Sequence, residues 1–149
     1  MHGSLPSRLQ KRGRMSEVVI ALPMPPTTNN LFAGTGRKRV KTRQYQAWEN
    51  NAGWALLRQR PAHIKGPVAV TIEVSDADSS NTWDLCNREK ATMDLLVTHG
   101  VIQGDHKPIV REFFMRWSPD ISGVRVIIRP LMPQTVNDVL RAAAERMGA

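Results

Sequence analysis

A stretch in the middle of the chain, WDLCNREKATMDLL at residues 83–96, carries polar side chains at the spacing of one helix face. On a helix of about 3.6 residues per turn, Asn87, Lys90 and Asp94 share one narrow stripe. Small or apolar side chains lie roughly opposite and are expected to be buried, namely Leu85, Thr92, Met93 and Leu96. A helix from near Asp84 to about Thr98 would therefore present an amide, an ammonium group and carboxylates along one edge.

A second acidic site follows this helix. The segment GVIQGDHKPIV places Asp105 in a glycine-containing turn just ahead of an expected strand. Because the chain turns back after the helix, Asp105 can meet Asp84 across a short gap. Two carboxylates brought together need a shared proton or a cation, and Mg²⁺ suits the second option because it takes oxygen ligands. A purely structural interpretation also holds: Asp84 caps the helix, and Lys90 forms an i,i+4 ion pair with Asp94.

The charge of the chain favours a polyanionic partner. It has 21 Lys and Arg against 13 Asp and Glu, a formal net charge of +8. Several acids nevertheless gather mid-chain: Asp76, Asp78, Asp84, Asp94 and Asp105. A basic body around an acidic patch suits an enzyme that holds a nucleic acid backbone and brings a divalent cation to it. A mobile basic arm is expected to grip that backbone through Arg37, Lys38, Arg39, Lys41 and Arg43.

The length of 149 residues fits one domain with its own core. We expect a basic, disordered N-terminal extension at residues 1–16 and a single domain at residues 17–149. One cysteine cannot form an intrachain disulfide, and no apolar run reaches the length of a signal peptide core or a membrane span. These features predict a cytoplasmic protein with no membrane partner.

The remaining elements predict an α+β fold. Strands are expected at residues 17–22, 68–75, 109–117 and 123–130, the last two forming a hairpin. Helices are expected from Thr42 to about Arg60, from near Asp84 to about Thr98, and from Thr135 or Asn137 to Met147. Four strands and three helices in mixed order indicate a small mixed β-sheet packed with two or three helices.

Three segments together resemble the RusA family of Holliday junction resolvases, small phage and bacterial endonucleases. They are LPMPPTTNN, WDLCNREKATMDLL and GVIQGDHKPIV, and the resemblance runs from about Val18 to Pro130. The family's D-x-D-N-x-x-K run is matched by Asp84, Asn87 and Lys90, with Cys86 at its second acid. The residues PPTTNN are similar to the Pro-Pro-Ser/Thr-x-Asn segment that follows the family's first strand.

The resemblance implies a homodimer that binds four-way DNA junctions and nicks opposed strands with the help of Mg²⁺. In that picture Asp84 and Asp105 hold the metal, and Lys90 stabilises charge on the phosphate or the leaving oxygen. Asn87 would orient a ligand or a phosphate. Two asparagines of the first motif, Asn29 and Asn30, would lie near the DNA.

Two departures from the family pattern concern the metal site. Cys86 replaces a metal-binding acid, and Gly104 stands where many relatives have another aspartate. A thiol is a poor ligand for Mg²⁺, which prefers hard anionic oxygen. Three explanations stay open: a weakened or inactive enzyme, use of Mn²⁺, or a replacement ligand among Asp76, Asp78 and Asp94. Two alternatives to an active nuclease also remain: a junction-binding protein of the same fold, and a basic nucleic-acid-binding module without enzymatic activity.

Overall fold

A computed structural model describes residues 17–132 and 136–148, so the expected N-terminal extension lies outside the described residues. The main sheet has the strand order β1-β6-β4-β5. Its strands are β1 (Val18–Leu22), β4 (Val68–Ser75), β5 (Val110–Ser118) and β6 (Val124–Pro130). Strand β6 pairs antiparallel with both β1 and β4, whereas β4 and β5 are parallel. The expected mixed sheet and the expected α+β fold are therefore confirmed.

The expected hairpin between β5 and β6 is wrong, because β4 lies between these two strands. The turn that follows β5 crosses the end of β4 and is held there by two backbone hydrogen bonds. The N–H of Asp76 donates to the carbonyl of Ser118, and the N–H of Ser75 donates to the carbonyl of Gly123, each at 2.9 Å. Alternation of side chains along a strand fixes its buried face and leaves open which strand is its neighbour. The sequence pattern therefore could not distinguish the two arrangements.

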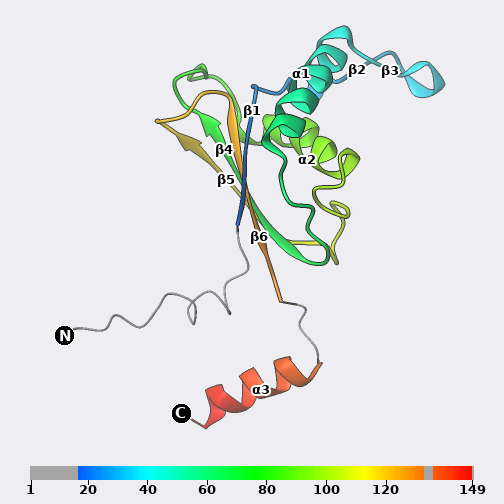
Figure 1. The fold of residues 1–149 in the computed structure, drawn as a ribbon. Coiled ribbons are helices and arrows are strands. Elements are labelled where there is room, and N and C mark those ends of the chain that lie inside the picture. The colour runs from blue at the N-terminus through cyan, green and yellow to red at the C-terminus, as the bar shows by residue number, and fades with distance from the viewer. Residues whose placement is uncertain (1–16, 133–135, 149) are drawn as a thin grey trace.

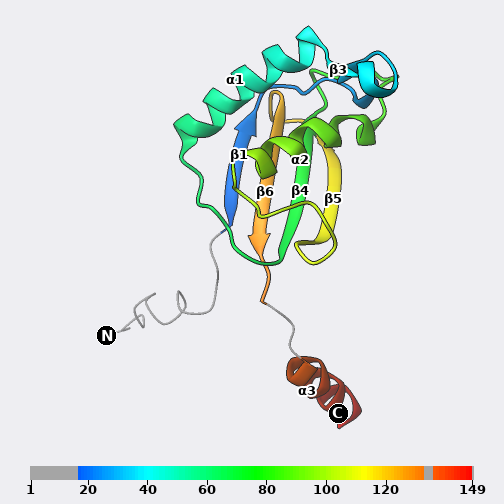
Figure 2. The same cartoon turned by 90° about the vertical axis from the view of Figure 1, so that its right-hand side faces the viewer.

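Two helices cover one face of this sheet, α1 (Arg43–Gln59) and α2 (Glu89–Thr98), as Figures 1 and 2 show. Helix α1 begins after Thr42, whose hydroxyl oxygen accepts the N–H of Tyr45 at 3.1 Å, as N-cap residues commonly do. Its buried side chains repeat at intervals of three and four, namely Tyr45, Trp48, Ala52 and Leu56. The helix expected from Thr42 to about Arg60 is confirmed.

Helix α2 does not begin as expected. Its first turn is a 3₁₀ helix, η3 (Leu85–Arg88), and the α-helix proper starts at Glu89. The Asp84 carboxylate makes no capping hydrogen bond, so the expected capping role is wrong. Only the Asp84 backbone carbonyl takes part, accepting the N–H of Asn87 at 3.2 Å. At the other end, Gly100 has a φ of +70°, the left-handed conformation expected after a helix.

The segment expected as a flexible basic arm forms a short hairpin. Strands β2 (Phe32–Ala33) and β3 (Val40–Lys41) pair antiparallel, and a 3₁₀ turn, η2 (Gly36–Lys38), lies between them. Gly34 makes this turn possible, because its φ is +88° and a Cβ there would lie 2.5 Å from the carbonyl oxygen of Lys38. The basic side chains therefore project from a defined element.

The expected C-terminal helix is present as α3 (Val136–Met147), drawn apart from the sheet in Figures 1 and 2. Across the described ranges, no helix is both long enough and apolar enough to cross a membrane.

The sheet face opposite the helices contains a buried carboxylate. Glu73 on β4 is the cross-strand neighbour of Arg116 on β5 and of Arg125 on β6. Its oxygens accept hydrogen bonds from Nε of Arg116 at 2.7 Å and Nε of Arg125 at 2.6 Å. The hydrogen bond from Arg125 is the main cause that lowers the pKa of Glu73, while burial acts in the opposite direction. The two arginines thus hold three adjacent strands in register through one side chain.

We expect Glu73→Gln to lower the free energy of unfolding at pH 7 by about 2 kcal/mol, because two charge-assisted hydrogen bonds lose their ionised acceptor. The pKa of Glu73 is lower in the folded protein than its usual 4.5. The advantage of the parent protein is therefore fully present above pH 4.5 and shrinks as pH falls through the folded-state pKa. Urea unfolding at several pH values measures this difference.

The matched control is Glu112→Gln on the same face, where Glu112 and Arg129 form an exposed ion pair at 3.1 Å. Exposed pairs contribute only about 0–1 kcal/mol, so this variant should unfold close to the parent. Equal losses in both variants would contradict the role given to Glu73.

Candidate active site

Two segments far apart in the sequence meet beside the start of α2. One is the loop after β1, which contains the short 3₁₀ helix η1 (Thr28–Asn30), and the other is the turn η3. The hydroxyl of Thr28 donates to the carbonyl of Asn87 at 3.4 Å. Nη1 of Arg88 donates to the carbonyl of Pro25 at 2.6 Å. The PPTTNN and D-x-x-N-x-x-K segments of the sequence are therefore held together by direct contacts.

Arg88 is the residue of this region that sequence reasoning missed. Its side chain is buried, and its guanidinium carbon lies 4.0 Å from the centre of the Trp83 ring, a cation–π contact. Burial lowers the pKa of Arg88. A signal was available, because Arg88 lies three residues after Leu85 and four before Thr92, on the stripe expected to be buried. A charged residue on a buried stripe indicates a specific structural role.

The expected metal ligands are at the surface. Asp84 and Cys86 are exposed at the beginning of η3, and Cys86 is a free thiol. Asp105 is exposed in the loop between α2 and β5. Its carboxylate lies near the first turn of α2, because it contributes to the raised pKa of Glu89. Burial is the main cause of that rise, Lys90 opposes it, and Asp105 and Asp94 add to it.

Glu89 is thus a second residue that sequence reasoning missed. It is half-buried at the first position of α2, and the Asp105 carboxylate lies close enough to influence its pKa. Its position gave a weak signal, since it lies between Asn87 and Lys90 in the matched motif. Burial is the main cause of its raised pKa, and the neighbouring carboxylates of Asp105 and Asp94 add to it.

Lys90 forms the expected ion pair with Asp94, with Nζ and Oδ1 separated by 3.1 Å. Both side chains are partly exposed, so the pair contributes little to stability and its ammonium group can change partners at low cost. Asp94 also lies near Tyr45 of α1, whose pKa is raised to about 12 by burial, by Glu49 and by Asp94.

One copy of the chain offers few side chains that could bind a metal ion together. Among residues 17–132 and 136–148, no three His, Cys, Asp or Glu side chains are gathered as a metal-binding group. Gly104 contributes to this scarcity. A Cβ at Gly104 would lie 2.5 Å from the ring of His106, so an aspartate there would require that ring to move. The carboxylates of Asp84 and Asp105 are compatible with Mg²⁺, which is commonly bound by one or two carboxylates together with waters and substrate phosphates.

The residues expected to bind DNA lie on η1, on the basic hairpin, at the start of α1 and, for Asn87, on η3. Asn29 and Asn30 are exposed, and the carbonyl of Asn30 accepts the hydroxyl of Thr42 at 2.6 Å, which joins η1 to the base of the hairpin. Arg37 and Lys38 are exposed on η2, and Arg43 is exposed at the start of α1.

Two further basic residues of the hairpin are partly engaged within the protein. The Arg39 guanidinium lies 4.6 Å from the centre of the Phe32 ring. Lys41 forms an ion pair with Glu49 at 3.0 Å. Both side chains remain exposed and are held in place at the foot of the hairpin.

A sheet covered by helices on one face, a basic hairpin and exposed carboxylates before α2 and after it are features of a protein that acts on nucleic acid. The family model described as endodeoxyribonuclease RusA matches residues 23–129. The chain therefore belongs to the RusA family of endodeoxyribonucleases, which act on Holliday junction DNA, and the resemblance read from the sequence is confirmed. A comparison with curated proteins gives no match.

Proposed function

We propose that the protein is a structure-selective endonuclease that binds four-way DNA junctions and nicks opposed strands by Mg²⁺-dependent phosphodiester hydrolysis, in DNA recombination and repair. The observation that carries this proposal is the contact between the two motif-bearing segments. Through Arg88 with Pro25, and Thr28 with Asn87, the loop with Asn29 and Asn30 lies directly against the turn that Asp84 opens. DNA held by that loop passes next to the proposed catalytic groups.

Binding would rest mainly on phosphate contacts from the basic hairpin. The hairpin offers Arg37, Lys38, Arg39 and Lys41, and Arg43 follows at the start of α1. The hairpin presents no helix of a shape that reads base edges in the major groove. Phosphate contacts of this kind position DNA without reading sequence and make affinity fall steeply with salt. Selectivity for a junction would then come from the shape of the DNA.

Asp84 and Asp105 would hold the metal, and Asn87 would orient a phosphate or a ligand beside them. A bound Mg²⁺ would supply an activated water and stabilise negative charge on the phosphate. Lys90 would exchange Asp94 for the phosphate or the leaving oxygen, which costs little because the ion pair is exposed. Cys86 stands beside this set as a soft ligand, and Mn²⁺ is the ion that would tolerate such a ligand better.

The alternative is a junction-binding protein of the same fold that cleaves poorly. The observations that favour it are the thiol of Cys86 at an expected acid and the glycine at position 104, where a side chain would require the His106 ring to move. Both changes remove negative charge from the same small site. The two predictions on cleavage below separate this alternative from an active enzyme.

We expect Asp84→Asn and Asp105→Asn each to abolish cleavage of a four-way junction while junction binding stays intact or becomes stronger. Each change removes a metal ligand and also removes repulsion between the carboxylate and DNA phosphates. Gel assays of nicking and of binding, run with Mg²⁺ and with EDTA respectively, measure both effects. The control is Glu145→Gln, an exposed carboxylate on α3. Nicking by both Asn variants at the parental rate would exclude these carboxylates from catalysis.

We expect Cys86→Asp to increase nicking at sub-saturating Mg²⁺ with little change in junction affinity, because a carboxylate binds Mg²⁺ better than a thiol. Cys86 is exposed, so the fold should accept the change. The measurement is a titration of Mg²⁺ for both proteins on the same junction. Superimposable titration curves would mean that position 86 does not contact the metal.

A homodimer is also proposed, because two opposed nicks require two sites in a fixed relation on a substrate with near two-fold symmetry. The sheet face opposite the helices supports this, since Val19 and Phe114 expose apolar surface there that a second copy would cover. Sedimentation velocity at micromolar protein should show a dimer, with and without junction DNA. A monomer under both conditions would count against the proposal.

A further inference from the structure

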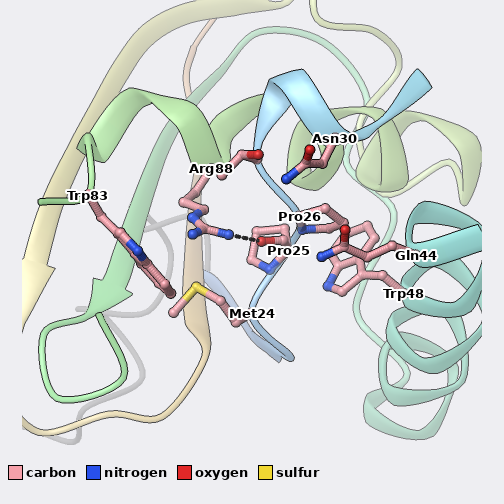
Figure 3. A pocket seen from close by; sticks show the side chains of 9 residues that line it. Met24, Pro25, Pro26, Asn30, Gln44, Trp48, Trp83 and Arg88 are labelled. Carbon is pink, nitrogen blue, oxygen red and sulfur yellow. Dashed lines mark hydrogen bonds between the residues drawn. The ribbon is translucent and has the colours of Figure 1, made fainter. Parts of the chain in front are cut away.

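A cavity of about 460 Å³ opens where the two motif-bearing segments meet. This volume lies within the range of roughly 300–1,000 Å³ typical of small-ligand sites. Nine residues line it: Met24, Pro25, Pro26, Thr27, Asn30, Gln44, Trp48, Trp83 and Arg88. In Figure 3, Trp83 and Arg88 lie on one side of the two prolines, and Asn30, Gln44 and Trp48 lie on the other.

The walls of the cavity combine apolar rings with polar side chains. Pro25, Pro26 and Trp48 are buried, so the bodies of their rings are fixed by packing. The indole N–H of Trp48 donates to the carbonyl of Pro23 at 3.0 Å, which fixes the orientation of that ring in the wall of the cavity. Trp83 provides a second indole. Surfaces of this kind suit a flat aromatic ligand, because stacking needs planar partners that lose little entropy.

The rim of the cavity adds hydrogen-bonding groups. Asn30 and Gln44 are exposed there, and each carboxamide offers both a donor and an acceptor. Such pairs match the donor and acceptor edges of nucleobases. None of the described residues that line the cavity is acidic. A ligand attached to a phosphate backbone would therefore meet no repulsion from the lining.

Arg88 provides a buried polar group, and such a group indicates a binding site for a ligand. Its side chain is 7% exposed, its Nη1 is occupied by Pro25, and its Nε is buried without a hydrogen-bond partner among the described residues. Burial also lowers the pKa of this guanidinium. The part of the guanidinium that lines the cavity can donate to an acceptor such as the carbonyl oxygen or ring nitrogen of a base.

We propose that this cavity receives one unpaired DNA base, displaced from its stack beside the point of strand exchange. The inference rests on the proposed function and adds a base-binding site to it. Trp83 directly precedes Asp84, so a base held against Trp83 fixes its own phosphate next to the proposed metal-binding carboxylates. A junction suits this arrangement, because stacking is already interrupted at its branch point and a base there costs less to displace than one inside a duplex.

Photo-cross-linking tests the proposal. A four-way junction carrying 5-iodouracil at the branch point is irradiated with the full-length protein in EDTA, and cross-linked peptides are identified by mass spectrometry. The expected cross-links are to Trp83, Trp48 or Met24. The same probe placed inside a duplex arm should give few cross-links to these residues.

The affinity of the protein for the junction is measured alongside the cross-linking. Gln44→Ala should weaken junction affinity roughly threefold to tenfold, the effect of losing one hydrogen bond to a base. The matched control is Asn51→Ala, an exposed amide two turns further along the same face of α1, which should bind as the parent does. Cross-links confined to the basic hairpin, no cross-links at all, or equal affinity of the parent and Gln44→Ala would each overturn the base site.

Because EDTA prevents metal-dependent cleavage, this result is independent of the nuclease assays. A protein that nicks junctions but cross-links only through the hairpin would retain its proposed activity and lose the base site. A protein that cross-links through the cavity but never nicks would retain the base site and lose the proposed catalysis.

Discussion

One guanidinium connects the parts on which the proposed active site depends. Arg88 reaches from the turn before α2 to the carbonyl of Pro25, 63 residues earlier in the chain, and lies against the ring of Trp83. These contacts fix the direction in which the chain enters η3, and with it the position of Asp84. A buried charge is costly unless it is partnered, so the structure around Arg88 has few other arrangements open to it. The contacts of Arg88 therefore connect the PPTTNN loop, the turn η3 and the cavity to one another.

The sequence predicted the elements well and their arrangement less well. Periodicity located both helices that cover the sheet and the alternating face of β4, because these patterns follow from local geometry and burial. It failed for the pairing of β5 and β6, since both strands carry the same alternation whether or not β4 separates them. The expected capping role of Asp84 was also wrong. Its residue type favours a helix cap, but the turn that follows is a 3₁₀ helix, and the carboxylate makes no capping hydrogen bond there.

The candidate site was also predicted from the sequence only in part. Motif spacing named Asp84, Asn87, Lys90 and Asp105, and the family match covers all of them. Arg88 and Glu89 were missed because their importance arises from burial and from neighbours distant in sequence. The structure also adds a physical constraint at Gly104, where the ring of His106 occupies the space of a side chain. A change at Cys86 meets no such obstacle, so the two departures from the family pattern are not equivalent.

The position of β6 has a consequence for how the protein is made. It is the last strand of the sheet in chain order, yet it lies between β1 and β4 and is the partner of β1 in that sheet. A ribosome therefore completes β1, both covering helices and β5 before residues 124–130 join the N-terminal strand to the rest. Until then β1 is connected to the earlier elements through α1, because the side chain of Gln59 is hydrogen-bonded to both the N–H and the carbonyl of Ala21.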